Sequence, residues 1–302
     1  MKKFFNLLLA ALAVVSVACT PNNEEGAENN NGNNNGPSDN TFVLNVVNIW
    51  ATDATAIVTP SNNDTYYCGH ITKERYDAYE GENIAQMLAD ELKAKCEEKG
   101  VSVSNYLFYG KKSIQFVGQL TPDTEYYAFV FGLSNDAVVT TDITTVPFKT
   151  LTQEEAAAGI DSGNKNIEGL VRGRVSNYED YYEVGASNWL IVLHDESGLG
   201  ELNIELLAAP SATELPVGEF PIASSMAVGT AIAGNLDEAY LMYGTFWTLR
   251  ANDKITMVEK TFLKSGTVTI NKSGDNYTIG INALDGHGNT FTTSYTGALE
   301  VR

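Results

Sequence analysis

Hydrophobic and polar residues alternate in short runs along most of the chain after residue 40. Alternation over about four to eight residues predicts strands with one buried face and one solvent face. In the first part, residues 41–150, we expect six strands, at residues 42–51, 54–59, 65–71, 113–117, 126–133 and 146–149. Such short, half-buried strands predict an antiparallel β-sandwich.

One segment of this first part has the period of a helix instead. Asn83 is an N-cap residue followed three positions later by Gln86, and Gly100 is a typical C-terminal signal. Ile84, Met87, Leu88 and Leu92 share one face of this helix, and the opposite face is charged, with Glu91 and Lys95 spaced to form an ion pair. We therefore expect a helical insertion at about residues 72–100 that packs on the sandwich.

A short motif gives the first part a more specific character. Leu120, Pro122, Thr124 and Tyr126 form an L-x-P-x-T-x-Y run just before an expected strand. This run resembles the tyrosine corner of fibronectin type III domains, in which the tyrosine ring packs on the core and its hydroxyl binds the preceding turn. The resemblance implies a fibronectin type III-like β-sandwich, although Trp50 comes too late in the first run to match that family's early tryptophan.

The second part begins after an expected linker at residues 151–166. From residue 167 to residue 302 the alternation continues without any long helical segment, which excludes a parallel α/β fold. We expect nine strands, at residues 167–175, 189–194, 201–206, 218–223, 239–250, 254–262, 267–271, 277–283 and 290–301. They predict a second antiparallel β domain, either a sandwich, a jelly roll or a barrel, and the chain as a whole is expected to be mainly β.

The N-terminal residues predict an export signal and a lipid anchor. Residues 1–18 have a basic start and a short apolar stretch that ends in Ser16-Val17-Ala18, directly before Cys19. This order is typical of a secretory signal whose following cysteine is lipidated. Residues 19–40 are rich in Asn and contain almost nothing that can be buried, which predicts a disordered tether.

Composition and charge narrow the range of functions. The chain has 19 Lys and Arg against 38 Asp and Glu, a formal net charge of −19, which opposes nucleic-acid binding. Only the lipid on Cys19 is expected to hold it on a membrane. With no nucleophile elbow, P-loop or zinc-protease motif, we expect no enzymatic activity and no cofactor.

The three Cys and three His residues are too few and too scattered for a zinc cluster. A disulfide between Cys68 and Cys96 and a pair of free, buried thiols are both open at this point. Asp285, His287 and Asn289 resemble part of a calcium loop, but no acid follows in residues 290–297. A structural turn is therefore favoured there, and no metal site is predicted.

Aromatic residues gather in two places in the second part. The first group lies in an expected loop and its border, where three tyrosines cannot all be buried, and its members are Tyr178, Tyr181, Tyr182, Asn188 and Trp189. Rings stack on the C–H faces of sugars, and carboxylates and amides bind sugar hydroxyls, so this group predicts a glycan site. In the second group, Tyr240, Tyr243 and Trp247 fall in an expected strand that alternates into the core.

The layout as a whole resembles outer-membrane lipoproteins of the Bacteroidetes, and in architecture alone the starch-binding lipoproteins that accompany nutrient importers. The resemblance implies a protein anchored in the outer membrane and exposed on the cell surface. Two hypotheses follow. One is a non-catalytic protein that binds a polysaccharide for nutrient capture. The alternative is a structural or adhesive protein that binds surface protein partners, with the fibronectin-like domain as a spacer.

Overall fold

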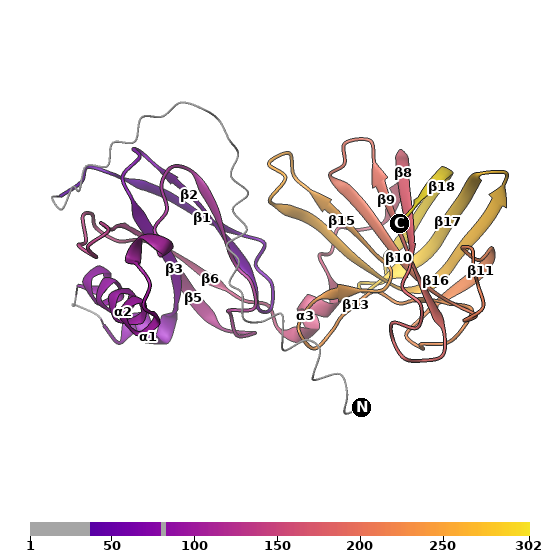
Figure 1. Ribbon diagram of the computed structural model, residues 1–302, viewed down its shortest axis with the longest axis horizontal. Helices are drawn as coiled ribbons and strands as arrows, with labels where there is room; N and C mark the ends of the chain where they lie inside the picture. The colour runs from indigo at the N-terminus through magenta and orange to yellow at the C-terminus, as the bar shows by residue number, and fades with distance from the viewer. Residues whose placement is uncertain (1–36, 80–82) are drawn as a thin grey trace. The chain divides into compact units, whose positions relative to one another are not determined.

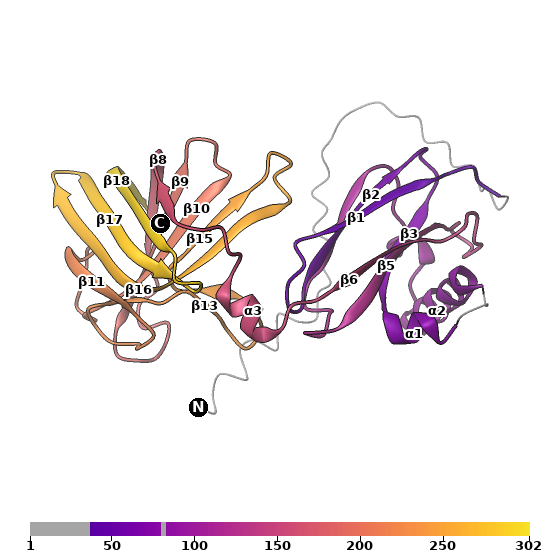
Figure 2. The same cartoon turned by 180° about the vertical axis from the view of Figure 1, so that it is seen from behind.

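The computed structural model describes residues 37–79 and 83–302, and their fold is mainly β, as predicted (Figures 1 and 2). The predicted signal peptide and Cys19 lie outside the described residues, as does most of the predicted tether. No helix among the described residues is long and apolar enough to cross a membrane.

Two three-stranded antiparallel sheets form the first part. One contains β1 (Phe42–Val47), β2 (Ala54–Pro60) and β4 (Lys112–Phe116), and the other contains β3 (Tyr66–Thr72), β5 (Glu125–Gly132) and β6 (Thr144–Lys149). Residues from both sheets, among them Leu44, Val58 and Val130, share one buried cluster. The structure therefore confirms the predicted sandwich of antiparallel sheets in this part.

The predicted helical insertion is present and covers the second of these sheets. It contains α1 (Lys73–Asp77) and α2 (Ile84–Lys99), followed by the short 3₁₀ helix η2 (Val103–Tyr106). Asn83 accepts a hydrogen bond from the Gln86 backbone, and Gly100 ends α2 in the left-handed region at φ 65°. Leu88 and Leu92 of α2 pack with Phe129 and Phe131 of β5, so burial of the helix's apolar face stabilises a third layer.

The predicted ion pair between Glu91 and Lys95 is wrong. Glu91 instead binds the guanidinium of Arg75, which α1 brings within reach. Lys95 lies over the ring of Tyr106, with its Nζ 5.6 Å from the ring centroid. Helix spacing favours the Glu91–Lys95 pair, but contacts with Arg75 and Tyr106 take its place in the folded chain.

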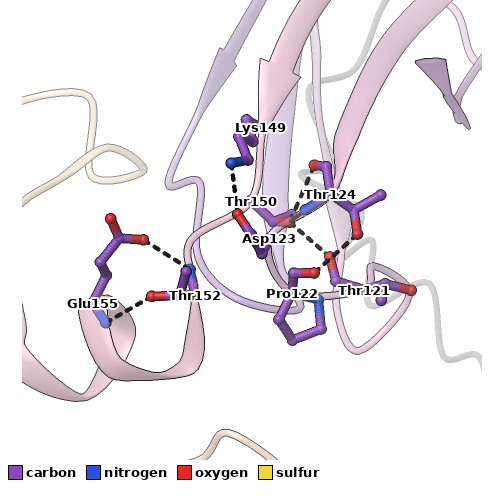
Figure 3. A network of polar contacts seen from close by, with 8 residues as sticks. All are labelled: Thr121, Pro122, Asp123, Thr124, Lys149, Thr150, Thr152 and Glu155. Atoms are coloured by element: carbon purple, nitrogen blue, oxygen red, sulfur yellow. Dashed lines mark hydrogen bonds and ion pairs between the residues drawn. The ribbon is translucent and has the colours of Figure 1, made fainter. Parts of the chain in front are cut away.

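The motif at the start of β5 makes the predicted corner. The hydroxyl of Tyr126 accepts a hydrogen bond of 2.9 Å from the backbone N–H of Thr121, and Leu120 is buried below it. Thr150 ties the turn to the end of β6, because its hydroxyl donates to the Thr121 carbonyl over 2.6 Å (Figure 3).

Trp50, in contrast, lies outside the sandwich core and packs in another cluster. Membership of the fibronectin type III family stays a prediction.

The second part is one large sheet that closes on itself. Its strands are β7 (Lys165–Ile167), β8 (Leu170–Asn177), β9 (Ser187–Asp195), β10 (Gly200–Ala208), β11 (Gly218–Ala223), β12 (Thr230–Ile232), β15 (Phe246–Arg250), β16 (Met257–Ser273), β17 (Asn276–Asp285) and β18 (Thr290–Val301). Closure arises because β9 pairs with both β8 and β10, while β16 pairs with β15, β17 and β11. A separate two-stranded pair contains β13 (Asn235–Leu236) and β14 (Met242–Tyr243).

Alternating residues of these strands fill the interior with an apolar core that includes Ile191, Leu202 and Ile281. Two predicted strands, residues 254–262 and 267–271, are in fact the single strand β16, with an irregularity between Leu263 and Ser265. The pairing is also not wholly antiparallel, since β18 lies parallel to β7 and β8. These parallel neighbours are separated by more than a hundred residues, so local pattern does not reveal them.

The expected linker contains α3 (Gln153–Ala158), which begins with a capping box between Thr152 and Glu155 (Figure 3). Leu151 and Ala156 pack in a buried cluster with Trp50 and Phe262. All described residues belong to one compact unit. Separate folding of the two parts therefore stays a prediction.

Candidate functional site

The loop between β8 and β9 presents two exposed aromatic rings. Tyr178 and Tyr181 are 51% and 63% exposed, and their ring centroids lie 6.4 Å apart at an interplanar angle of 62°. We call this pair the tyrosine shelf. The ring of Tyr182 lies edge-to-face against Tyr181, at 5.0 Å and 85°. Two successive ring contacts therefore link Tyr178 and Tyr181 to Tyr182.

Tyr182 anchors the shelf to the sheet. Its hydroxyl donates a hydrogen bond of 2.5 Å to Oε2 of Glu205 on β10. Burial, followed by the nearby Glu205 carboxylate, raises the pKa of Tyr182 well above its usual range. The ring packs against a small buried cluster that contains Ala186, Leu207 and Ile232. Tyr182 is therefore a support for the two exposed tyrosines.

The loop backbone is held by its own polar side chains. The carboxylate of Asp180 accepts hydrogen bonds from the backbone N–H groups of Val184 and Gly185, at 2.8 and 2.9 Å. The carbonyl of Glu179 accepts a further bond from the Asn188 N–H over 2.6 Å. Because these bonds fix the chain on both sides of Tyr181, the shelf is ordered before any ligand arrives.

Two predicted site residues are buried beneath this loop. Asn188 and Trp189 are only 3% and 5% exposed, since both lie in β9 where the sheet covers them. The Asn188 amide lies 3.5 Å from Glu205, and Trp189 packs in the interior core. Of the five predicted site residues, the structure presents Tyr178 and Tyr181 to solvent and places the other three behind them.

Glu205 is the residue that the pattern of the sequence did not single out. Its two carboxylate oxygens receive the Tyr182 hydroxyl and the backbone N–H of Gly244 at 3.1 Å. These partners lie 23 and 39 residues away along the chain. The one signal in the sequence is that Glu205 is an acid between two apolar residues of the strand, at a position that is half-buried in β10.

Exposed acids flank the shelf. Glu179 and Glu183 are exposed, and neither carboxylate makes a hydrogen bond or ion pair to another described residue. Free carboxylate oxygens accept hydrogen bonds from hydroxyl groups. The loop therefore combines apolar ring faces with carboxylate oxygens that have no hydrogen-bond partner among the described residues.

The second aromatic group enters the core only at Trp247, because the strand expected at residues 239–250 is divided into β14 and β15 and Tyr240 lies outside both. Trp247 is 2% exposed and packs in the interior core, and its Nε1 donates to Glu259 over 2.7 Å. Tyr240 and Tyr243 are half-buried and pack in two other clusters. This group offers no comparable exposed surface.

Two of the three cysteines lie in the part of the chain that the structure describes. Cys68 and Cys96 are free and buried, and burial raises the pKa of the Cys68 thiol to about 12. They pack in different clusters, so the alternative of two free thiols is the one observed. No group of three or more acids, His or Cys among residues 37–79 and 83–302 is placed to hold a metal ion.

Hydrogen bonds within the turn after β17 and to the linker segment hold its backbone. Asp285 accepts hydrogen bonds from the backbone N–H groups of His287 and Asn289, at 2.9 and 2.8 Å. The Asn289 amide donates to Asp161 over 2.9 Å. The turn therefore fixes the end of the linker segment to the sheet.

Two comparisons with known proteins found no match. No protein-family model matches this sequence, and no curated protein matches it.

Proposed function

We propose that this protein is a lipid-anchored cell-surface protein that binds saccharides without catalysis, for nutrient capture, and that the tyrosine shelf is its contact surface. One observation carries the proposal: two tyrosines more than half exposed stand side by side on a loop that hydrogen bonds hold in place. Adjacent exposed apolar groups rimmed by polar residues often mark a ligand or partner contact.

The chemistry of the shelf suits a sugar. The C–H face of a pyranose stacks on a tyrosine ring, and the ring has few rotatable bonds to immobilise. The carboxylates of Glu179 and Glu183, exposed on the same loop, can accept hydrogen bonds from sugar hydroxyls. The order of the loop reduces the entropy lost on binding, so modest contacts suffice for measurable affinity.

Attachment to the outer membrane through Cys19 is part of the proposal. Labelling of cells with a fatty-acid analogue is expected to mark the native protein and not a Cys19→Ala variant. Label retained by that variant would remove the anchor from the proposal and leave the binding surface untouched.

The binding test is a glycan array on the chain from residue 37 onward, followed by titration of any hit. Tyr181→Ala is expected to weaken binding at least tenfold, and Tyr178→Ala to weaken it several-fold. Tyr109→Ala is the matched control, because Tyr109 is 64% exposed and lies in the first part of the chain. No hit at millimolar ligand, or a hit indifferent to both shelf variants, would contradict the proposal and favour the adhesive alternative.

A further inference from the structure

A second feature lies on the outer face of the closed sheet, where β11, β16, β17 and β18 run side by side (Figures 1 and 2). Register places Glu219, Thr269, Gly280 and Ser294 in one row across these four strands. A shallow depression of about 370 Å³ lies over this row, lined by Glu219, Thr267, Thr269, Gly280, Ile281, Asn282 and Thr293.

The fold does not explain the glycine at the floor of this depression. Gly280 lies in the middle of β17 with an ordinary backbone conformation, and a Cβ built on it would meet no atom within 4 Å. Gly266 in the neighbouring strand differs, because its φ is 122° and a Cβ there would lie 2.2 Å from the Asn282 carbonyl oxygen. Glycine inside a strand weakens the strand, and one without a structural need often marks close approach of a ligand.

Most side chains that line the depression are polar, and four of them have no hydrogen-bond partner among the described residues. The side chains of Glu219, Thr267, Thr269 and Asn282 make no hydrogen bond or ion pair to another described residue. They supply two hydroxyls, an amide and one carboxylate, and none of the lining residues is basic or aromatic. This set can donate to and accept from hydroxyl groups, but it has no positive charge to hold a phosphate, sulfate or uronate.

From this combination we infer that the depression is a binding site for a neutral sugar ring, with Gly280 leaving room for it. Glu219 accepts hydrogen bonds from hydroxyl groups at one side, and Thr267, Thr269 and Asn282 complete the hydrogen bonds around the ring. The inference does not depend on the tyrosine shelf, because different strands and different chemistry form the two surfaces. If both surfaces contact one polysaccharide, the second contact acts at high effective concentration and increases avidity.

The test uses substitution of the glycine itself. Valine at this position adds a side chain that strands favour, so Gly280→Val is expected to melt at the same temperature as the native protein or higher. The probes are glucose, mannose, galactose, xylose, cellobiose and maltose, titrated at millimolar concentration into ¹⁵N-labelled protein from residue 37 onward. We expect at least one to shift the backbone amides of residues 219, 267, 269, 280 and 282.

Gly280→Val is expected to abolish those shifts, and Glu219→Gln to weaken the affinity several-fold. Thr278→Val is the matched control, since Thr278 is an exposed residue on the same face of β17 but does not line the depression. The inference is overturned if no probe moves these amides, or if Gly280→Val binds as well as the native protein. Shifts confined to the loop of Tyr178 and Tyr181 would support the tyrosine shelf and contradict this second site.

Discussion

The two aromatic groups of the closed-sheet domain have similar compositions and opposite fates. Tyr178 and Tyr181 stand in solvent on a loop, whereas Trp247 is enclosed by the core and satisfies its N–H on Glu259. The difference lies in the backbone. A strand sends alternate side chains inward, whereas in the loop after β8 only Tyr182 of the three tyrosines packs on a buried cluster. Exposure of aromatic residues is therefore informative only after the strand period has been taken into account.

The comparison also separates residues that stabilise the fold from residues that bind ligand. The buried group is expected to stabilise the fold and contribute nothing to binding. The exposed group is expected to bind ligand and contribute little to the fold. Substitutions in and between the two groups test this division.

Trp247→Ala is expected to have the largest effect on stability. Removing this buried indole leaves a cavity in the core, which costs about 3–5 kcal/mol of unfolding free energy. It also removes one hydrogen bond from Glu259, whose other carboxylate oxygen keeps its ion pair with Lys165. Urea denaturation of the native and variant proteins measures the difference. A loss below about 1 kcal/mol would show that Trp247 is less well packed than its burial indicates.

A second prediction concerns the lysine within the aromatic cluster near Tyr240. Lys260 is buried, and its Nζ lies 3.4 Å from the centroid of the Trp50 ring. Burial lowers the pKa of Lys260 from 10.5 to about 7, and the negative charge of Asp53 partly opposes this. Between these two pH values the unfolded chain binds the proton and the folded chain does not, so stability rises as pH rises from about 7 to 10.5.

The unfolding free energy of the native protein, relative to that of Lys260→Met, should therefore rise as the pH increases through that window. Below pH 7 the folded protein must bury the charged ammonium, so the native protein should stay at its least stable relative to the variant. The full shift corresponds to about 5 kcal/mol, but the Trp50 ring attracts the ammonium, so we expect about 2–3 kcal/mol. Denaturation at several pH values measures it, with the exposed Lys93→Met as control. A native-minus-variant difference that does not change with pH would contradict the buried, neutral lysine.

Tyr182→Phe sharpens the comparison at the boundary between the two groups. It keeps the ring but removes the hydroxyl that binds Glu205, which is expected to cost about 1–2 kcal/mol of stability. Ligand affinity should fall only a few-fold, because the exposed rings remain. If the affinity is lost entirely, Tyr182 contacts the ligand directly and its role as a support is wrong.

Much of the fold follows from local pattern, and its failures have a common cause. The caps of α2 at Asn83 and Gly100, and the corner at Tyr126, depend on residues only a few positions apart. The closure of the sheet and the parallel pairing of β18 depend on partners far away, which alternation does not identify. The prediction of two strands at residues 254–262 and 267–271 is wrong, because β16 continues through residues 263–266 with only an irregularity between Leu263 and Ser265.

The candidate site was predictable to the same extent. The loop composition revealed that tyrosines must be exposed, and Tyr178 and Tyr181 are. It did not reveal that Asn188 and Trp189 begin the next strand, where pairing of β9 with β8 and β10 buries them. Glu205 and the depression at Gly280 arise from strand register, and the sequence pattern did not indicate either of them.

The tyrosine shelf itself should contribute least to stability. The double variant Tyr178→Ala, Tyr181→Ala removes two side chains that are more than half exposed, so its unfolding free energy should stay within about 0.5 kcal/mol of the native value. Urea denaturation provides this number. A larger loss would show that the rings are held as part of the structure.

The most direct test of the account is calorimetric titration of one array-selected oligosaccharide into the native protein and this double variant. The account predicts micromolar-to-millimolar binding by the native protein and no detectable heat from a double variant that melts normally. Unchanged affinity in the double variant would contradict the central claim that the exposed tyrosines of the β8–β9 loop are the contact surface.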